Sequence, residues 1–224
     1  MDNTNKTPPP FASNLPTPTS FSVTVAKEDF KFNLAHFVAY PGFRERLHGH
    51  NYTLSITLLS PNPLLQSDGY VVDFGVVKKS VRAVCKSLNE RVIIPTNSDV
   101  IKIYSTTENE APHTRLECED KTVFLFPTAD CFMAPIVHST VEEIALYMYG
   151  RIVEGIGDDY LKERNVREMV LKISEAPGQA AEMHLAVMPG FDRKAWEESG
   201  YNGRLKGGEG IMEWTRGCCE RCGK

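Results

Sequence analysis

Long hydrophobic runs are missing from this chain of 224 residues. No stretch approaches the roughly 18 consecutive apolar residues that a membrane-spanning helix needs. The amino terminus lacks the basic start and apolar core of a signal peptide, and it has too little arginine for a transit peptide. We therefore expect no membrane association and a cytoplasmic protein.

An excess of basic residues is also missing. The chain has 25 Lys and Arg against 29 Asp and Glu, which gives a net charge of −4 and a pI near 5.9. This balance provides no electrostatic argument for binding nucleic acid or an anionic membrane surface, and we expect neither partner.

Cysteines are few. Three are scattered and three lie near the carboxyl end: Cys85, Cys118, Cys131, Cys218, Cys219 and Cys222. Without a secretion signal they indicate reduced thiols rather than a disulfide framework. The single CxxC of the tail has no partner pair, so an unpaired tail is favoured over half of a metal or redox site.

The composition is otherwise that of one globular domain, with 42% hydrophobic and 24% charged residues. Residues 1–20 are rich in Pro, Ser and Thr without periodicity, and we predict a disordered head. The folded domain is expected over residues 21–189. Periodicity is lost after Pro189, so residues 190–224 are predicted to be an extension outside the core.

Hydrophobic periodicity predicts strands and two helices within this domain. Asp73 is expected to cap the first helix, whose apolar stripe is Phe74, Val77, Val81, Val84, Cys85 and Leu88. Thr140 and Glu143 form a capping box at the start of the second, which should end near Gly155 or Gly157. Strands are predicted at 21–25, 30–36, 50–58 and 169–175, with short strands at 100–104, 114–117 and 122–126 around a polar loop at 106–112.

The predicted fold class is α+β, with an antiparallel sheet, two helices on one face and an inserted hairpin. Three histidines fall on this sheet. His48 and His50 are two residues apart on one strand, so both imidazoles point to the same face, and His36 is in phase on the preceding strand. Each could be an ordinary hydrogen-bonded histidine, but three converging imidazoles with no fourth protein ligand are typical of a catalytic zinc site.

These histidines also carry a resemblance to a known family. The residues concerned are His36, the HGHNY box at 48–52, the Asp73-Phe74 helix start, Thr140, Glu142 and Glu175. From about Phe21 to Val187 the chain resembles 6-pyruvoyl-tetrahydropterin synthase and its relatives, which include the 6-carboxy-tetrahydropterin synthases.

The resemblance implies the tunnelling fold, a four-stranded antiparallel sheet with two helices on one face. It also implies subunits joined edge to edge into trimers, with two trimers stacked as a homohexamer. His36, His48 and His50 would hold Zn²⁺, and the substrate would be 7,8-dihydroneopterin triphosphate.

The resemblance further implies that Glu175 anchors the pterin, since a carboxylate can accept the adjacent amino group and ring N–H together. Thr140 and Glu142 would line the same pocket, although helix capping and the helix dipole explain both residues equally well. Arg44, Arg46 and Lys27 are unranked candidates for the triphosphate.

Two departures from the family pattern bear on the product. The usual cysteine before HGH is absent, and Glu45 stands three residues before His48. This ExxHGH arrangement resembles a subgroup, from apicomplexan parasites and some bacteria, that forms 6-hydroxymethyl-7,8-dihydropterin for folate synthesis. Glu45 would then be the catalytic base, although it could also be a surface glutamate between two arginines.

The second departure is Asn89-Glu90-Arg91, where the family usually has an Asp-His relay. We therefore predict a zinc-dependent lyase that gives the hydroxymethyl product. The alternatives are 6-pyruvoyl-tetrahydropterin formation for tetrahydrobiopterin biosynthesis and a non-catalytic pterin-binding paralogue. A carboxy-tetrahydropterin synthase of the queuosine route is disfavoured by the missing cysteine.

Overall fold

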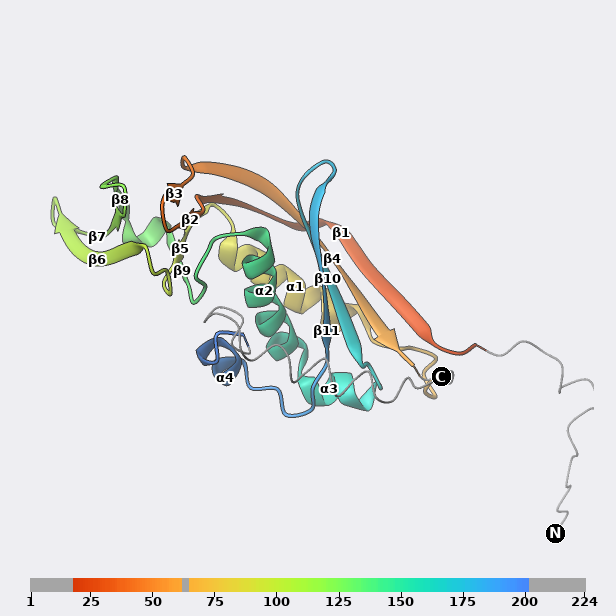
Figure 1. Cartoon of the computed structure of the whole chain (residues 1–224). Coiled ribbons are helices and arrows are strands. Elements are labelled where there is room, and N and C mark those ends of the chain that lie inside the picture. Colours follow the sequence, from red (N-terminus) through yellow and green to blue (C-terminus); the bar gives the residue numbers. More distant parts are fainter. Residues whose placement is uncertain (1–17, 62–64, 202–224) are drawn as a thin grey trace, which may run out of the picture.

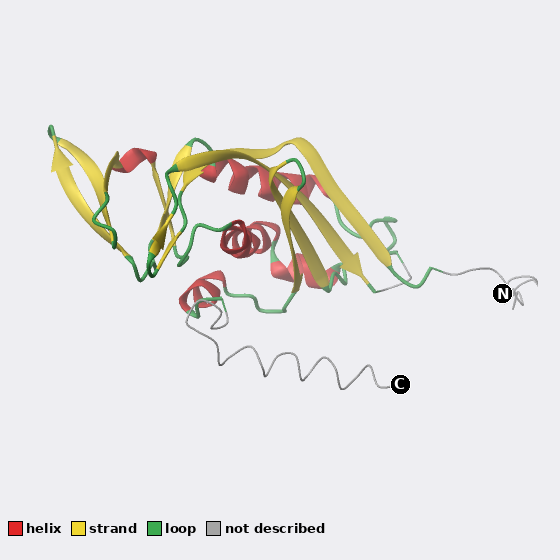
Figure 2. Cartoon of the chain, turned by 45° about the horizontal axis from the view of Figure 1, so that its top comes forward, coloured by secondary structure: helices red, strands yellow, loops and turns green. Residues whose placement is uncertain are grey.

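A computed structural model describes residues 18–61 and 65–201. Most of the predicted head and the cysteines of the tail lie outside these residues. The fold is α+β, as predicted, with a six-stranded sheet that arches over two helices (Figures 1 and 2). Its strands are β1 (Phe21–His36), β4 (His48–Ser60), β5 (Arg91–Pro95), β9 (Cys131–Ala134), β10 (Glu168–Ala176) and β11 (Gln179–Ala186).

The sheet has the order β11-β10-β4-β1-β5-β9 and is mixed rather than purely antiparallel. The predicted strands β10, β4 and β1 are antiparallel neighbours, and β11, which was not predicted, pairs antiparallel with β10 at the edge of the sheet. The expectation of four strands was incomplete, because β5 pairs in parallel with β1 and β9 in parallel with β5. Both added strands are short, and an apolar run of this length gives no reliable periodicity in the sequence.

The first strand is a single long element instead of two predicted strands. Its pairing with β4 shifts between Ala26 and Lys31, which lie opposite Ser55 and Thr53. Five steps along β1 therefore match two steps along β4. Because the two strands differ by an odd number of residues here, odd-numbered residues of β1 face the core before the shift and even-numbered ones after it. Val25 and Phe30 are therefore both buried.

Helices α1 (Phe74–Leu88) and α2 (Val141–Ile156) lie under one face of the sheet (Figure 1). Both predicted caps form: Asp73 accepts a hydrogen bond from the Gly75 amide, and Thr140 accepts one from the Glu143 amide. The predicted apolar stripe of α1 is buried except for Phe74. This residue is the first of the helix and is 46% exposed.

Gly155 lies within the last turn of α2, and the helix ends one residue later, at Ile156. A methyl group on Gly155 would overlap the hydroxyl of Ser80 on α1. Ser80 donates a 3.0 Å hydrogen bond to the Ile152 carbonyl of α2. Glycine is therefore required at this position for the close approach of the two helices.

The insertion between β5 and β9 forms a second sheet that projects from the main one (Figure 1). It consists of β6 (Ile101–Glu108), β7 (Ala111–Cys118) and β8 (Val123–Pro127), which correspond to the three short strands predicted for the insertion. The predicted polar loop at 106–112 was wrong, since β6 and β7 extend to a tight turn at Asn109 and Glu110, both with positive φ. A separate apolar cluster lies beneath this sheet: Phe37, Ala39, Ile94, Ile101, Leu116, Cys118 and Cys131.

After α2 follow the short helices α3 (Asp158–Glu163) and, beyond β11, α4 (Arg193–Glu198). We expected the chain after Pro189 to lie outside the core. Instead Trp196 packs against the main cluster, and Tyr201 is buried within it. The periodicity is too short there to reveal a six-residue helix.

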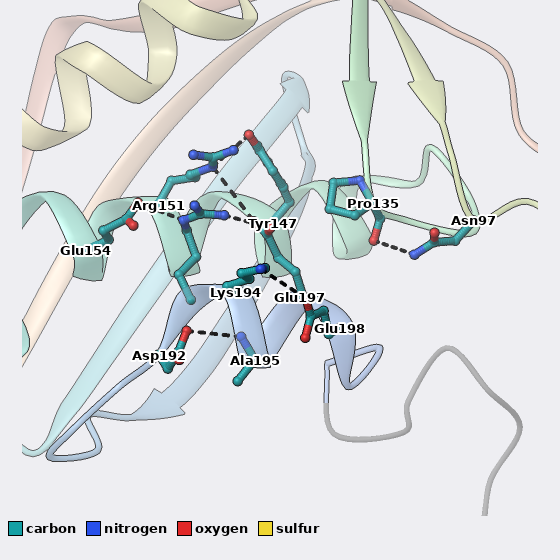
Figure 3. A network of polar contacts seen from close by, with 11 residues as sticks. Asn97, Pro135, Tyr147, Arg151, Glu154, Asp192, Lys194, Ala195, Glu197 and Glu198 are labelled. Atoms are coloured by element: carbon teal, nitrogen blue, oxygen red, sulfur yellow. Dashed lines mark hydrogen bonds and ion pairs between the residues drawn. The ribbon is translucent and has the colours of Figure 1, made fainter.

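Charged contacts also join α4 to α2 (Figure 3). Arg193 of α4 donates a hydrogen bond of 2.7 Å to Glu154 of α2, and Arg151 of α2 lies 3.8 Å from the carboxylate of Glu197 in α4. Within the described residues, no helix is both long and apolar enough to cross a membrane.

Candidate functional site

The three predicted histidines meet where β1 and β4 pair. His36 ends β1 opposite His48, and His50 lies opposite Leu34. One ring nitrogen from each histidine lies within 4.8 Å of the other two, which is a spacing that can hold a metal ion. Gly49 permits this geometry, because a Cβ there would come within 3.3 Å of the Leu34 carbonyl oxygen.

Hydrogen bonds orient two of the imidazoles. The Nδ1–H of His36 donates to the Ser139 carbonyl at 2.7 Å, and that of His48 donates to the Arg46 carbonyl at 2.8 Å. Each Nε2 atom therefore carries the lone pair. Burial lowers the pKa of His36, which favours the neutral form that binds metals.

Tyr52 joins the histidines to Glu175. Its hydroxyl donates a 3.0 Å hydrogen bond to Glu175 Oε1 and lies 3.4 Å from His36 Nε2. Burial raises the pKa of Tyr52, and the negative charges of Glu175 and Glu45 raise it further. Tyr52 thus remains a neutral donor in this site.

A β-bulge positions Glu175. Ser174 pairs with Ala180 and Ala176 with Gln179, so Glu175 is the extra residue on β10. We did not predict a role for Tyr52 from the sequence. The available signal was its position two residues after His50, which places both side chains on one face of β4.

Glu45 follows a small hairpin formed by β2 (Ala39–Tyr40) and β3 (Phe43–Arg44). It is half-buried, and its backbone N–H donates a 2.9 Å bond to the Val38 carbonyl. In return, the Val38 N–H donates a 3.0 Å bond to Glu45 Oε2. This exchange fixes Glu45 beside the residues that follow His36.

Arg44, one of the two arginines next to Glu45 in the sequence, is bonded to the insertion. It forms a 2.8 Å ion pair with Asp120 and donates a 2.9 Å hydrogen bond to Thr122, both at the turn before β8. Its guanidinium also lies 5.5 Å from the centre of the Phe124 ring. Arg44 is therefore committed to the insertion.

The two residues predicted to line the pterin pocket, Thr140 and Glu142, lie at the start of α2. Thr140 directly follows Ser139, whose carbonyl holds His36, so it lies next to the histidine group. Glu142 is exposed on the first helical turn of α2.

Glu90 and Arg91, at the position where a relay was expected to be missing, line a cavity of about 450 Å³ together with His50. Asn89 accepts a 2.9 Å hydrogen bond from the Asn33 amide, and the Glu90 amide donates one of 2.7 Å to the Asn33 carbonyl. Asn89 is thus engaged by the backbone, and neither residue can reproduce an Asp-His pair.

Comparison with known proteins agrees with these features. The model of the family described as 6-pyruvoyl tetrahydropterin synthase matches residues 24–185. The chain belongs to this family. Family members are lyases, and the chain is an enzyme of this class acting in pterin chemistry. The match ends before α4.

Relatives of the chain include proteins of known structure. A 6-pyruvoyl tetrahydropterin synthase from Plasmodium vivax is 42% identical, covering 75% of this chain and 99% of its own, with a TM-score of 0.69. The Plasmodium falciparum enzyme is 39% identical with the same coverage and TM-score. A putative 6-carboxy-5,6,7,8-tetrahydropterin synthase from Methanocaldococcus jannaschii is 26% identical over 159 residues, covering 67% of this chain and 87% of the relative.

Two further solved structures are variants of the Plasmodium vivax enzyme, each 41% identical to this chain. In these variants a glutamate described as a catalytic residue is replaced by alanine or by cysteine.

Proposed function

We propose that the chain is a zinc-dependent lyase that converts 7,8-dihydroneopterin triphosphate to 6-hydroxymethyl-7,8-dihydropterin, with Glu45 as base. The observation that carries this proposal is the position of Glu45, whose carboxylate is held by the Val38 amide two residues after His36 and whose charge acts on Tyr52. The family usually has a cysteine in this loop. The catalytic glutamate described for the Plasmodium vivax relative supports the proposal.

The three histidines fit zinc. Among residues 18–61 and 65–201 the group offers three imidazole nitrogens and no fourth protein ligand, the donor set of a catalytic zinc centre with an open position. The hydrogen bonds from His36 and His48 to backbone carbonyls are the usual outer support of such ligands. Zinc bound there would act as a Lewis acid toward the side-chain hydroxyls of the substrate.

In the proposed reaction, Glu45 removes the proton of the hydroxyl on C2′. The C1′–C2′ bond then breaks as the C2′–O bond becomes a carbonyl, and the electron pair passes to C1′ and the conjugated pterin. A proton returned to C1′ completes the 6-hydroxymethyl group, and the other product is glycolaldehyde triphosphate. No external oxidant or reductant is needed.

The remaining residues of the pocket would hold the ring. Glu175 would accept the amino group and ring N–H of the pterin, with Tyr52 keeping its carboxylate in place. Thr140 and Glu142 are proposed to line the same pocket. We also propose the tunnelling fold, a homohexamer and a cytoplasmic location.

The alternative product is 6-pyruvoyl-tetrahydropterin, formed by triphosphate elimination. The names of the Plasmodium relatives favour it. The engaged side chain of Asn89 and the missing histidine beside it argue against it, because this route needs several proton shifts.

The test is incubation of the zinc-loaded protein with 7,8-dihydroneopterin triphosphate, followed by identification of the pterin by mass. A 6-hydroxymethyl product that is lost in Glu45→Gln and kept in Glu110→Gln, a change in an exposed turn, supports the proposal. A 6-pyruvoyl product overturns it in favour of the alternative. Substrate that binds but stays unchanged indicates a binding paralogue.

A further inference from the structure

Glu143 is a buried carboxylate whose role the proposed reaction leaves unexplained. It lies in the first turn of α2 and is only 7% exposed. Its Oε2 atom accepts hydrogen bonds from two consecutive backbone amides, that of Val137 at 2.8 Å and that of His138 at 2.9 Å. The carboxylate therefore fixes the segment that leads into the helix.

This segment, residues 137–139, is bonded in turn to the chain around His36. The Ser139 carbonyl accepts the 2.7 Å bond from His36 Nδ1, and the Ser139 hydroxyl donates a 2.7 Å bond to the Phe37 carbonyl. The ring of His138 donates a 2.9 Å bond to the Ala39 carbonyl. Three hydrogen bonds thus hold residues 36–39 against residues 137–139.

Val38 lies in the middle of the held segment and exchanges two hydrogen bonds with Glu45. The position of Glu45 is therefore set by the same backbone that carries His36. We propose that Glu143 is a positioning residue that fixes His36 and Glu45 relative to each other without touching the substrate. This inference rests on the proposed roles of zinc and Glu45.

A carboxylate is suited to this position for two reasons. It accepts two amides at one oxygen through charge-assisted hydrogen bonds, which are stronger than neutral ones. It also lies near the amino end of α2, where the helix dipole favours negative charge. A residue that served only to start the helix would affect stability and leave the geometry at His36 unchanged.

The test uses Glu143→Ala and Glu143→Gln in the full chain. Zinc affinity is measured by competition with a chromogenic chelator, and ligand geometry by the visible spectrum of the cobalt-substituted protein. We expect Glu143→Ala to weaken zinc binding about 10–100-fold, the usual effect of removing an outer support of a ligand. We also expect an altered cobalt spectrum and a lower kcat with little change in KM.

Glu143→Gln keeps an acceptor oxygen and should recover most of the zinc affinity. Glu154→Gln is the matched control, because it removes a carboxylate from the exposed far end of the same helix and should leave zinc affinity unchanged. The inference is overturned if Glu143→Ala lowers only the melting temperature while zinc affinity, cobalt spectrum and kcat stay as in the parent.

His48→Ala separates this inference from the function on which it rests. If the parent protein binds no zinc, or His48→Ala binds it equally well, the proposed metal site itself is wrong. If zinc binding requires His48 but does not depend on Glu143, only the positioning role fails.

Discussion

The hydroxyl of Tyr52 donates a 3.0 Å hydrogen bond to the carboxylate of Glu175. A hydrogen bond to a charged group contributes about 1.5–3 kcal/mol, so Tyr52→Phe should weaken pterin binding by about tenfold or more. Zinc content should stay the same. The measurement is the Kd for the pterin by calorimetry. Tyr149→Phe, which removes a buried hydroxyl bonded to the Ala186 carbonyl, is the control. Equal affinity in Tyr52→Phe and the parent would mean that Glu175 needs no such support.

Zinc should stabilise the native protein, because the three-histidine group is assembled only on folding. At a zinc concentration 1,000 times the Kd the gain is about 4 kcal/mol, or roughly 8–16 °C in melting temperature for a chain of this size. The measurement is a thermal scan with and without a chelator. His48→Ala should abolish the difference, whereas His113→Ala, in the insertion, should retain it.

Gly155→Ala should destabilise the protein, although alanine favours helix more than glycine does. The added methyl group would overlap the Ser80 hydroxyl, and overpacking of this kind costs about 1–3 kcal/mol. Denaturant unfolding measures the loss. In the double variant with Ser80→Ala, part of it should be recovered, since the obstructing oxygen is gone. Strictly additive effects would show that the two helices separate instead of clashing.

His184 should make stability depend on pH. Its ring lies 2.7 Å from Glu168 and 3.3 Å from Glu182, and the hydrogen bond to Glu168 is the main cause of its raised pKa. The folded protein therefore binds this proton more tightly than the unfolded chain. The stabilisation is complete below the unfolded value of about 6.5 and is lost as pH rises through the folded pKa.

We accordingly expect His184→Gln to be less stable than the parent at pH 6 and to approach it at pH 8.5. Thermal scans at the two pH values measure this gap. A gap that widens with pH would contradict the sign of the shift. His113→Gln is the matched control, because the ring of His113 bonds to the Ala111 carbonyl and not to a carboxylate.

The features predicted best from the sequence are those with a strict local rule. Strand alternation placed His48 and His50 on one face, and side-chain caps fixed the starts of both long helices at Asp73 and Thr140. The family membership followed from the same residues and is confirmed by the match over residues 24–185.

The features that were missed depend on contacts between distant segments. The phase change in β1 arises only from its register with β4, and the pairing of β5 and β9 joins residues far apart in the chain. The bonds of Ser139 to His36 and Phe37 likewise cross about 100 positions, so no spacing rule reveals them. The packing of Trp196 depends on the surface of α2, and the sequence of the six-residue helix α4 does not reveal this partner.

The two hydrophobic clusters meet at the three-histidine group, because Leu34 belongs to the main cluster and Phe37 to the cluster under the insertion. Separate clusters can open locally with different free energies. We expect opening of the smaller cluster to release His36 while the large sheet stays intact. The stability of the cluster under the insertion would then set how long a bound metal ion stays. Substitutions in that cluster, far from the histidines, would change the rate at which the ion dissociates.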